Sequence, residues 1–108
     1  YRWLFPRMSV VVHHGGAGTT GAGLRAGVPN IVVPFTADQP FWASRVRALG
    51  AGPEPIALRK LTAERLAAAI DQAQNDETLR ARCRALGEKI DAEDGVARAM
   101  RLVTMETP

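Results

Sequence analysis

A glycine-rich stretch between an apolar run and a short helical pattern constrains this chain most. It covers residues 13–20, His-His-Gly-Gly-Ala-Gly-Thr-Thr. Residues 10–12 are three valines, and such a short β-branched run is typical of a buried strand. Residues 22–26 carry apolar side chains at helical spacing, and Gly27 followed by Pro29 ends that pattern as helices usually end. The sequence therefore predicts a strand, a glycine-rich turn and a helix, in that order.

The same stretch has the chemistry of a phosphate-binding turn. The first turn of a helix offers backbone N–H groups without partners and a partial positive charge. Gly16 and Gly18 have no side chains, so an anion can approach their backbone closely. Thr19 and Thr20 add hydroxyl donors, and His14 lies where its imidazole can reach the same oxygens. We interpret these five residues as a phosphate site.

Two other interpretations of the stretch stay open on the motif alone. Gly16, Gly18 and Gly21 satisfy the G-x-G-x-x-G pattern of dinucleotide-binding proteins, and Asp38 follows about 20 residues later, where that pattern places a ribose-binding acid. In that case the chain is the NAD(P)-binding Rossmann domain of an oxidoreductase. In the other interpretation, the glycines serve only the geometry of the turn.

A second strand and the turn after it extend the pattern. Residues 30–34 are mostly apolar and end at a proline, which predicts another buried strand. The turn at 36–40 leads into a helix that ends at Gly50, with Asp38 or Gln39 at its N-cap. A helix between two strands makes them parallel, so both turns lie at the carboxyl edge of one α/β sheet, where such sheets bind ligands.

The rest of the chain predicts helices and little further strand. Its prolines allow at most a short edge strand near Ile56. Apolar residues recur at helical spacing over 62–73, over 76–90 and, after an interruption at Gly95, over 96–103. Thr62 is the expected N-cap of the first of these helices, and Asp76 or Asn75 is expected to start the second.

Length and composition exclude several classes of protein. At 108 residues the chain is one domain at most, and because it opens on Tyr1 and soon reaches a core strand, we expect a piece of a longer protein. No apolar run approaches the ~20 residues of a membrane span. The net charge is +3, but acids flank the arginines of 80–84, which favours a solvated helix over nucleic-acid binding. Cys83 lies on an apolar helical stripe, which indicates a core residue. As the single cysteine it cannot form an internal disulfide, which agrees with a reducing, cytoplasmic setting.

Three ordered blocks resemble the donor-binding signature of UDP-dependent glycosyltransferases. They are residues 14–20 (His-Gly-Gly-Ala-Gly-Thr-Thr), 26–29 (Ala-Gly-Val-Pro) and 34–42 (Pro-Phe-Thr-Ala-Asp-Gln-Pro-Phe-Trp). The branch they resemble most contains sterol 3-β-glucosyltransferases and bacterial macrolide or flavonoid glycosyltransferases. The resemblance implies that residues 1–108 form the later part of the C-terminal, nucleotide-sugar-binding domain of a GT-B fold. That domain has a Rossmann-like parallel sheet covered by helices, and the implied acceptor-binding domain lies upstream.

The resemblance also implies roles for particular residues. His14 would hydrogen-bond the donor diphosphate, and residues 16–20 would supply N–H and hydroxyl donors to the phosphates. Asp38 and Gln39 would bind sugar hydroxyls. Ala22 stands where many plant members have a ribose-binding glutamate, so the resemblance does not decide between UDP and TDP.

The expected function is transfer of a hexose from a UDP-sugar or TDP-sugar to a hydroxyl of a lipophilic acceptor such as a sterol, flavonoid or macrolide, with inversion. The base is expected upstream, so no catalytic residue is assigned here. No metal is expected, because the adjacent His13 and His14 point to opposite sides of an extended strand. No other cofactor is expected either, because the nucleotide sugar is itself a substrate. His13 is expected to be a structural member of the strand end. We also expect an unpaired strand edge and no sugar transfer by residues 1–108 alone.

Overall fold

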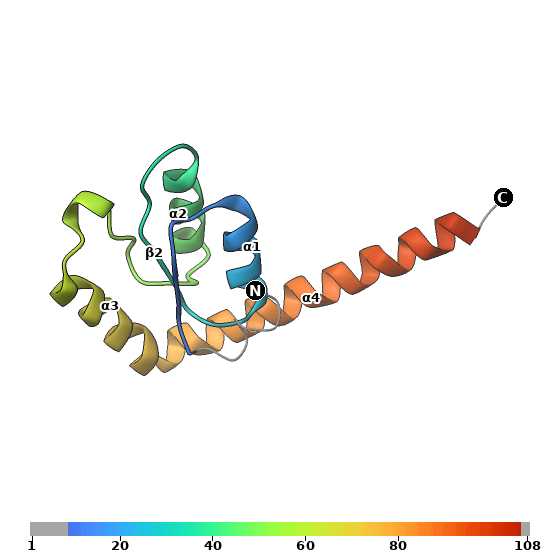
Figure 1. Ribbon diagram of the computed structural model, residues 1–108. Coiled ribbons are helices and arrows are strands. Elements are labelled where there is room, and N and C mark those ends of the chain that lie inside the picture. The colour runs from blue at the N-terminus through green and yellow to red at the C-terminus, as the bar shows by residue number, and fades with distance from the viewer. Residues whose placement is uncertain (1–8, 107–108) are drawn as a thin grey trace.

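The computed structural model describes the backbone of residues 9–106 and the side chains of residues 9–94. Figure 1 shows a small sheet with helices around it and one long helix that extends away from this body. The elements in chain order are β1 (Val11–His13), α1 (Ala17–Arg25), β2 (Asn30–Val32), α2 (Gln39–Ala48), the 3-10 turn η2 (Leu58–Lys60), α3 (Ala63–Asn75) and α4 (Glu77–Glu106).

The two strands are parallel, as predicted from the helix that connects them. Val11 pairs with Asn30 and His13 with Val32, so both strands end at the same edge of the sheet. All three residues of β2 are buried, as expected for a parallel strand covered on both faces. Within the described residues β1 pairs only with β2, which leaves the unpaired edge that the sequence predicts.

The segment after α2 runs beside the other edge of β2 without becoming a strand. Asn30 N–H donates to the carbonyl of Ala51 at 2.9 Å, and Ile56 N–H donates to the carbonyl of Val32 at 3.0 Å. The sequence allows at most a short edge strand near Ile56; the segment lies where that strand would be, but it is not assigned as one. Pro53 and Pro55 have no N–H groups to complete a ladder.

The core is apolar and lies between the sheet and the helices. Its buried members are Val10, Ile31, Val32, Ala43, Val46, Ala51, Ala69, Ala73, Leu79 and Cys83. The thiol of Cys83 donates to the carbonyl of Ala51 at 3.4 Å, and burial raises its pKa to about 11. The prediction of a core cysteine is confirmed, because Cys83 is buried. The raised pKa also makes its thiol a poor nucleophile.

The starts of α3 and α4 agree with their predicted caps, but the predicted break at Gly95 is wrong. Thr62 Oγ1 accepts the N–H of Arg65 at 3.1 Å, and Asp76 Oδ1 accepts the N–H of Leu79 at 3.0 Å. Helix α4 then continues through Gly95 to Glu106. A single glycine costs a helix about 1 kcal/mol, which does not suffice to break a long one.

Helix α4 packs its first half across the end of α1. A Cβ at Gly87 would lie 2.8 Å from Gly27 Cα, so these helices meet with almost no side chain between them. Arg25 at the end of α1 forms ion pairs with Asp91, at 3.7 Å, and with Asp94. None of the described helices is both long enough and apolar enough to cross a membrane.

Candidate functional site

The two predicted loops meet at the carboxyl edge of the sheet. Gly15, in the first loop, has φ of +94°, and a Cβ there would lie 3.0 Å from both the carbonyl oxygen of Gln39 and Val32 Cγ1. Only glycine adopts this conformation easily and fits this space. Gly15 therefore brings the turn that starts α1 against the turn that starts α2.

His14 is an exposed residue that is anchored by one of its ring nitrogens. Its Nδ1 lies 2.9 Å from the carbonyl oxygen of Val33, at the end of β2. A carbonyl only accepts, so Nδ1 carries the proton of the neutral ring and Nε2 carries a lone pair. For His14 to donate from Nε2 to a phosphate oxygen, the ring must be the imidazolium. The anchored ring can thus give a charge-assisted hydrogen bond to an anion.

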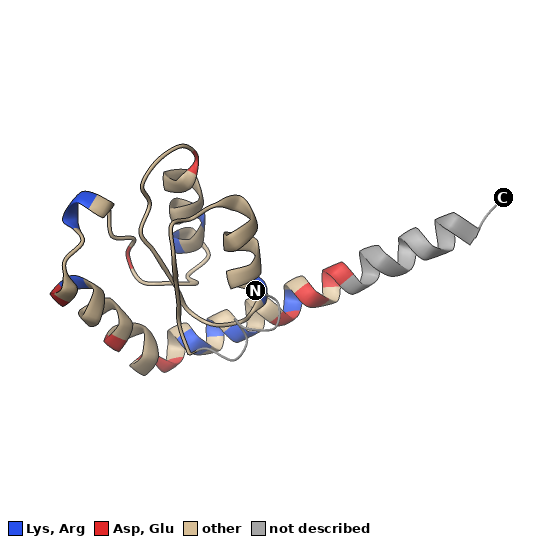
Figure 2. Cartoon of the chain, in the orientation of Figure 1, with Lys and Arg blue, Asp and Glu red and all other residues tan. Residues whose placement is uncertain are grey.

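The start of α1 is open and lacks basic side chains. The helix begins at Ala17 with Gly16 at its N-cap, and its first turn contains neither an acid nor a base, as Figure 2 shows. A Cβ at Gly16 or Gly18 would meet nothing within 4 Å. The first N–H groups of the helix have no acceptors within it, so they face this space as anion donors.

Thr20 is placed differently from the rest of the predicted phosphate site. Because α1 begins at Ala17, Thr20 already lies inside the helix, and its N–H donates to the carbonyl of Gly16 at 2.8 Å. Its side chain is 1% exposed, and its hydroxyl has no hydrogen-bond partner among the described residues. Thr19 is half-buried. The structure therefore separates Thr20 from the open helix start.

The second loop is held by the side chain of Gln39. Its Oε1 accepts the N–H groups of Phe35, at 2.7 Å, and Thr36, at 3.0 Å. This role occupies the amide oxygen and leaves the amide NH₂ as a donor. Between these residues Ala37 has φ of +55°, a left-handed conformation that costs a non-glycine residue about 1–3 kcal/mol. The loop shape is thus imposed by its contacts.

Asp38 occupies the N-cap position of α2, but its carboxylate does not cap the helix. Instead Oδ2 accepts the indole N–H of Trp42 at 3.0 Å. Of the two residues predicted for the N-cap, Asp38 is correct by position only. Trp42 was missed as a functional neighbour, although its i, i+4 spacing from Asp38 is a signal for a contact on one helix face.

His13 is confirmed as a structural residue of the strand end. Its Nε2 lies 2.9 Å from Asn30 Oδ1, and its Nδ1 accepts the N–H of Gly15 at 3.0 Å. Burial lowers the pKa of His13 below 6.5; the Asn30 hydrogen bond opposes this, and the charge of His14 adds to it. Asn30 was not predicted as part of this network, because a buried amide partner has no sequence periodicity.

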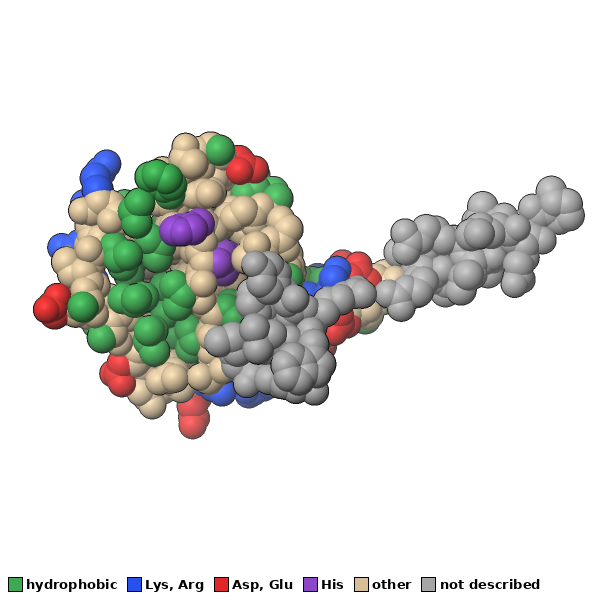
Figure 3. Space-filling model, in the orientation of Figure 1, with side chains coloured by type: hydrophobic (Ala, Val, Ile, Leu, Met, Phe, Trp, Pro, Cys, Tyr) green, Lys and Arg blue, Asp and Glu red, His purple; other side chains and the backbone are tan. Residues whose placement is uncertain are grey.

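Aromatic and apolar side chains are exposed around these loops. Phe35 is 65% exposed and Phe41 58% exposed, and Figure 3 shows both histidines at the surface beside hydrophobic side chains. No group of three or more metal-binding side chains is found among the described residues. The surface at this edge therefore combines polar donors with apolar neighbours.

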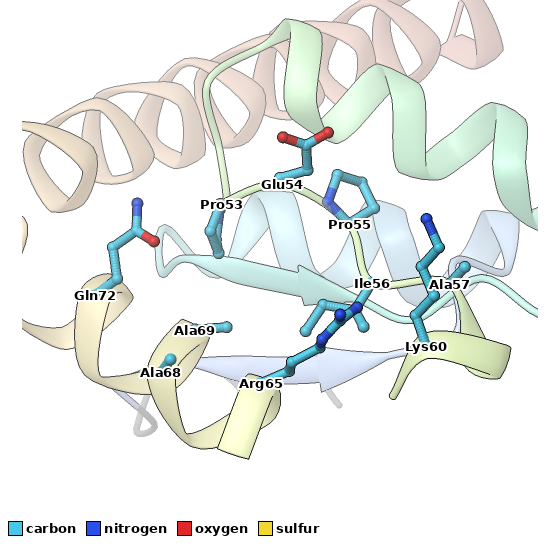
Figure 4. Close-up of a pocket in the computed structure, with 10 residues that line it drawn as sticks. All are labelled: Pro53, Glu54, Pro55, Ile56, Ala57, Lys60, Arg65, Ala68, Ala69 and Gln72. Atoms are coloured by element: carbon cyan, nitrogen blue, oxygen red, sulfur yellow. The ribbon is translucent and has the colours of Figure 1, made fainter. Parts of the chain in front are cut away.

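A separate hollow lies away from the predicted site. It has a volume of about 410 Å³ and lies between α3 and the segment before η2 (Figure 4). Pro53, Ile56 and Ala69 are among its lining residues, and none of the predicted site residues lines it. It takes no part in the site at the carboxyl edge.

Parallel strands joined by a helix, with a glycine-rich helix start at their carboxyl edge, define a Rossmann-like α/β unit. The chain belongs to the family described as erythromycin biosynthesis protein CIII-like, C-terminal domain, whose model matches residues 2–101. The fold class and the resemblance predicted from the sequence are confirmed.

Curated relatives of this chain are glycosyltransferases. It is 48% identical over 103 residues to an O-mycaminosyltylonolide 6-deoxyallosyltransferase of Streptomyces fradiae, which covers 95% of the chain and 24% of that protein. It is also 48% identical over 101 residues to a sterol 3-beta-glucosyltransferase of Cryptococcus neoformans, which covers 94% of the chain and 6% of that protein. The chain thus spans a quarter or less of these two relatives.

Solved glycosyltransferases share the fold. The glycotransferase of kitacinnamycin has a TM-score of 0.81 and 33% identity, covering 97% of this chain and 27% of that one. Glycosyltransferase VinC, solved in complex with DTDP, has a TM-score of 0.71 and 27% identity, covering 94% of this chain and 27% of that one. Nothing in these comparisons favours the oxidoreductase alternative.

Proposed function

We propose that this chain binds the nucleotide-sugar donor of an inverting glycosyltransferase that acts on a lipophilic acceptor. The observation that carries the proposal is the close contact between the two loops at Gly15. Because of this contact, the anchored imidazole of His14 and the open start of α1 lie beside the turn that holds Asp38 and Gln39. The names of the relatives, which act on a sterol and a tylonolide, and the DTDP in one structural neighbour support it.

In this proposal the donor is divided between the two loops. The diphosphate takes hydrogen bonds from His14, from the backbone at Gly16 and Gly18, and from the hydroxyl of Thr19. The carboxylate of Asp38 and the free amide NH₂ of Gln39 bind sugar hydroxyls. Thr20 stays a predicted phosphate contact from the sequence, but its buried hydroxyl does not support that role.

The chemistry follows from where charge develops. An acceptor hydroxyl attacks the anomeric carbon, the bond to the diphosphate breaks, and negative charge grows on the leaving phosphate oxygens. Donors fixed beforehand stabilise such charge without reorganisation during the reaction. The proposal assigns this task to His14 and the start of α1 in place of a metal ion, and it assigns the base to another part of the enzyme. UDP binding should therefore be the same in excess EDTA.

The diphosphate contact is tested with His14→Ala and His14→Gln in the full-length protein. Loss of a hydrogen bond to a charged group costs about 1.5–3 kcal/mol, so His14→Ala should weaken UDP and TDP binding roughly 10- to 150-fold by calorimetry. His14→Gln keeps a neutral donor and should lose less. Equal affinity in wild type and His14→Ala overturns the assignment.

The sugar contact is tested with variants that preserve the loop. Asp38→Asn retains an acceptor for Trp42, and Gln39→Glu retains an acceptor for Phe35 and Thr36 but loses the amide donor. Both should weaken UDP-glucose binding more than UDP binding, so the ratio of the two Kd values changes. Trp42→Phe removes the partner of Asp38 and serves as the control for loop stability. A parallel loss of both ligands contradicts the sugar role, and a selective loss of NAD binding in Asp38→Asn supports the dinucleotide alternative.

A further inference from the structure

The side chain of His13 is fully engaged although the proposed donor contacts do not use it. Gly15 N–H only donates, so Nδ1 of His13 accepts it and the ring proton lies on Nε2. That proton points to Asn30 Oδ1 at 2.9 Å. The orientation of Asn30 is fixed in turn, because its Nδ2 donates to the carbonyl of Val28 at 2.9 Å. The three hydrogen bonds form one chain with a single consistent set of protons.

This polar chain occupies space that the fold leaves for it. Asn30 is fully buried, and a Cβ at Gly23 would lie 2.0 Å from its Oδ1. A Cβ at Gly52 would lie 1.9 Å from its backbone oxygen. Two glycines, one on α1 and one after α2, therefore accommodate a buried amide at the start of β2. Buried polar groups are costly unless every partner is present, and here each bond is made.

The end of the chain of hydrogen bonds is the turn that presents His14. Gly15 has φ of +94°, and its N–H is held by the imidazole two residues before it. This bond closes the turn between β1 and α1. In the closed turn, His14 Nδ1 lies against the carbonyl of Val33, and Gly16 is the N-cap of α1. The imidazole of His13 therefore fixes the conformation of the turn by accepting the N–H of Gly15.

We propose that His13, oriented by Asn30, is a positioning residue for nucleotide-diphosphate binding. It holds residues 14–16 in the shape that binds the diphosphate before the ligand arrives. This inference rests on the proposed function. A turn that is ordered in advance spares the ligand the entropic cost of ordering it, which raises affinity.

The test compares His13→Asn with His13→Leu in the full-length protein. An asparagine side chain accepts the N–H two residues ahead in an Asx-turn, so His13→Asn keeps the acceptor for Gly15. Leucine has no acceptor. We expect His13→Leu to bind UDP about tenfold more weakly and His13→Asn to stay within about threefold of the wild type, both measured where the variants are folded. Equal affinity in His13→Leu and the wild type overturns the positioning role alone. Absence of UDP and TDP binding in the wild type overturns the proposed function, and the inference with it.

A measurement on the wild type covers the case in which His13→Leu does not fold. Nitrogen NMR of the imidazole reports which ring nitrogen carries the proton. We expect His13 to be protonated at Nε2 with a hydrogen-bonded Nδ1, and the amide of Gly15 to be protected from exchange already in the absence of UDP. A proton on Nδ1, or a Gly15 amide that is protected only when UDP is bound, overturns the proposal.

Discussion

Adjacent histidines in this chain carry their ring protons on opposite nitrogens. His13 accepts a hydrogen bond at Nδ1 from Gly15, whereas His14 donates from Nδ1 to the carbonyl of Val33. The backbone partner decides each case, because an N–H only donates and a carbonyl only accepts. Two identical side chains therefore have different chemistry, one closed within the fold and one open to an anion.

The lowered pKa of His13 predicts a loss of stability in acid. Burial is the largest cause, so the folded protein binds this proton less readily than the unfolded chain. The stabilisation is complete above the unfolded value of 6.5 and decreases as the pH falls below it toward the folded value. We expect the Tm to fall more between about pH 7 and about pH 5 in the wild type than in His13→Asn, which retains His14. Identical slopes in the two proteins contradict this linkage.

The buried hydroxyl of Thr20 predicts a stabilising substitution. An unpartnered buried hydroxyl costs about 1–3 kcal/mol, and valine has the same shape without it. Thr20→Val should therefore raise the Tm and leave UDP affinity unchanged. Thr19→Val is the matched control, and we expect it to weaken UDP binding without raising the Tm. A loss of UDP affinity in Thr20→Val would show that the sequence-based phosphate role is correct and that the hydroxyl turns outward on binding.

At the scale of elements, substitutions at two glycines of α1 distinguish the role of the helix start from that of the rest of the helix. A Cβ at Gly18 or Gly21 would meet nothing within 4 Å, so alanine fits at both positions. Either substitution should stabilise the helix by up to about 1 kcal/mol. Only Gly18 lies in the first turn, however, where the new methyl group occupies the space of the proposed diphosphate.

We therefore expect Gly18→Ala to weaken UDP binding about tenfold while Gly21→Ala binds like the wild type, as measured by calorimetry on the full-length protein. A Tm at or above that of the wild type in both variants would show that neither is misfolded. An equal effect of the two substitutions on affinity would place the ligand away from the helix start.

At the scale of the whole molecule, the two loops, 19 residues apart at His14 and Val33, are joined by the His14–Val33 hydrogen bond and by the close contact at Gly15. The groups proposed to bind the diphosphate and those proposed to bind the sugar therefore lie on one edge. This arrangement leaves the imidazole of His14 and the carboxylate of Asp38 engaged, the first with Val33 and the second with Trp42. In the proposed complex the remaining nitrogen of His14 binds the diphosphate and the remaining oxygen of Asp38 binds sugar hydroxyls, so the proposal assigns the base elsewhere.

Residues 1–108 alone should therefore be able to bind a nucleotide but not to transfer a sugar from it. We expect no sugar transfer from UDP-glucose or a TDP-sugar to a sterol or macrolide by this chain, and transfer by the full-length protein under the same conditions. Product detection by mass spectrometry decides the question. Transfer by residues 1–108 alone contradicts the assignment of the base to another part of the enzyme.

The local order of elements is determined by the sequence. A valine run, glycines and a following apolar stripe predict β1, the turn and α1, because backbone geometry restricts where each residue type is stable. The same reasoning places Thr62 and Asp76 at helix starts, and both cap as expected. It fails at Gly95, where a local helix breaker is outweighed by the helix on either side.

Only the tertiary structure decides which side chains are free to act. Thr20 belongs to the predicted phosphate site by spacing, but α1 begins early and turns its hydroxyl into the interior. The oxygen of Gln39 is used within its own loop, and Asn30 supports the first loop from the start of β2. Such roles depend on contacts between residues far apart in the chain or on where a helix begins, and residue spacing alone does not specify either.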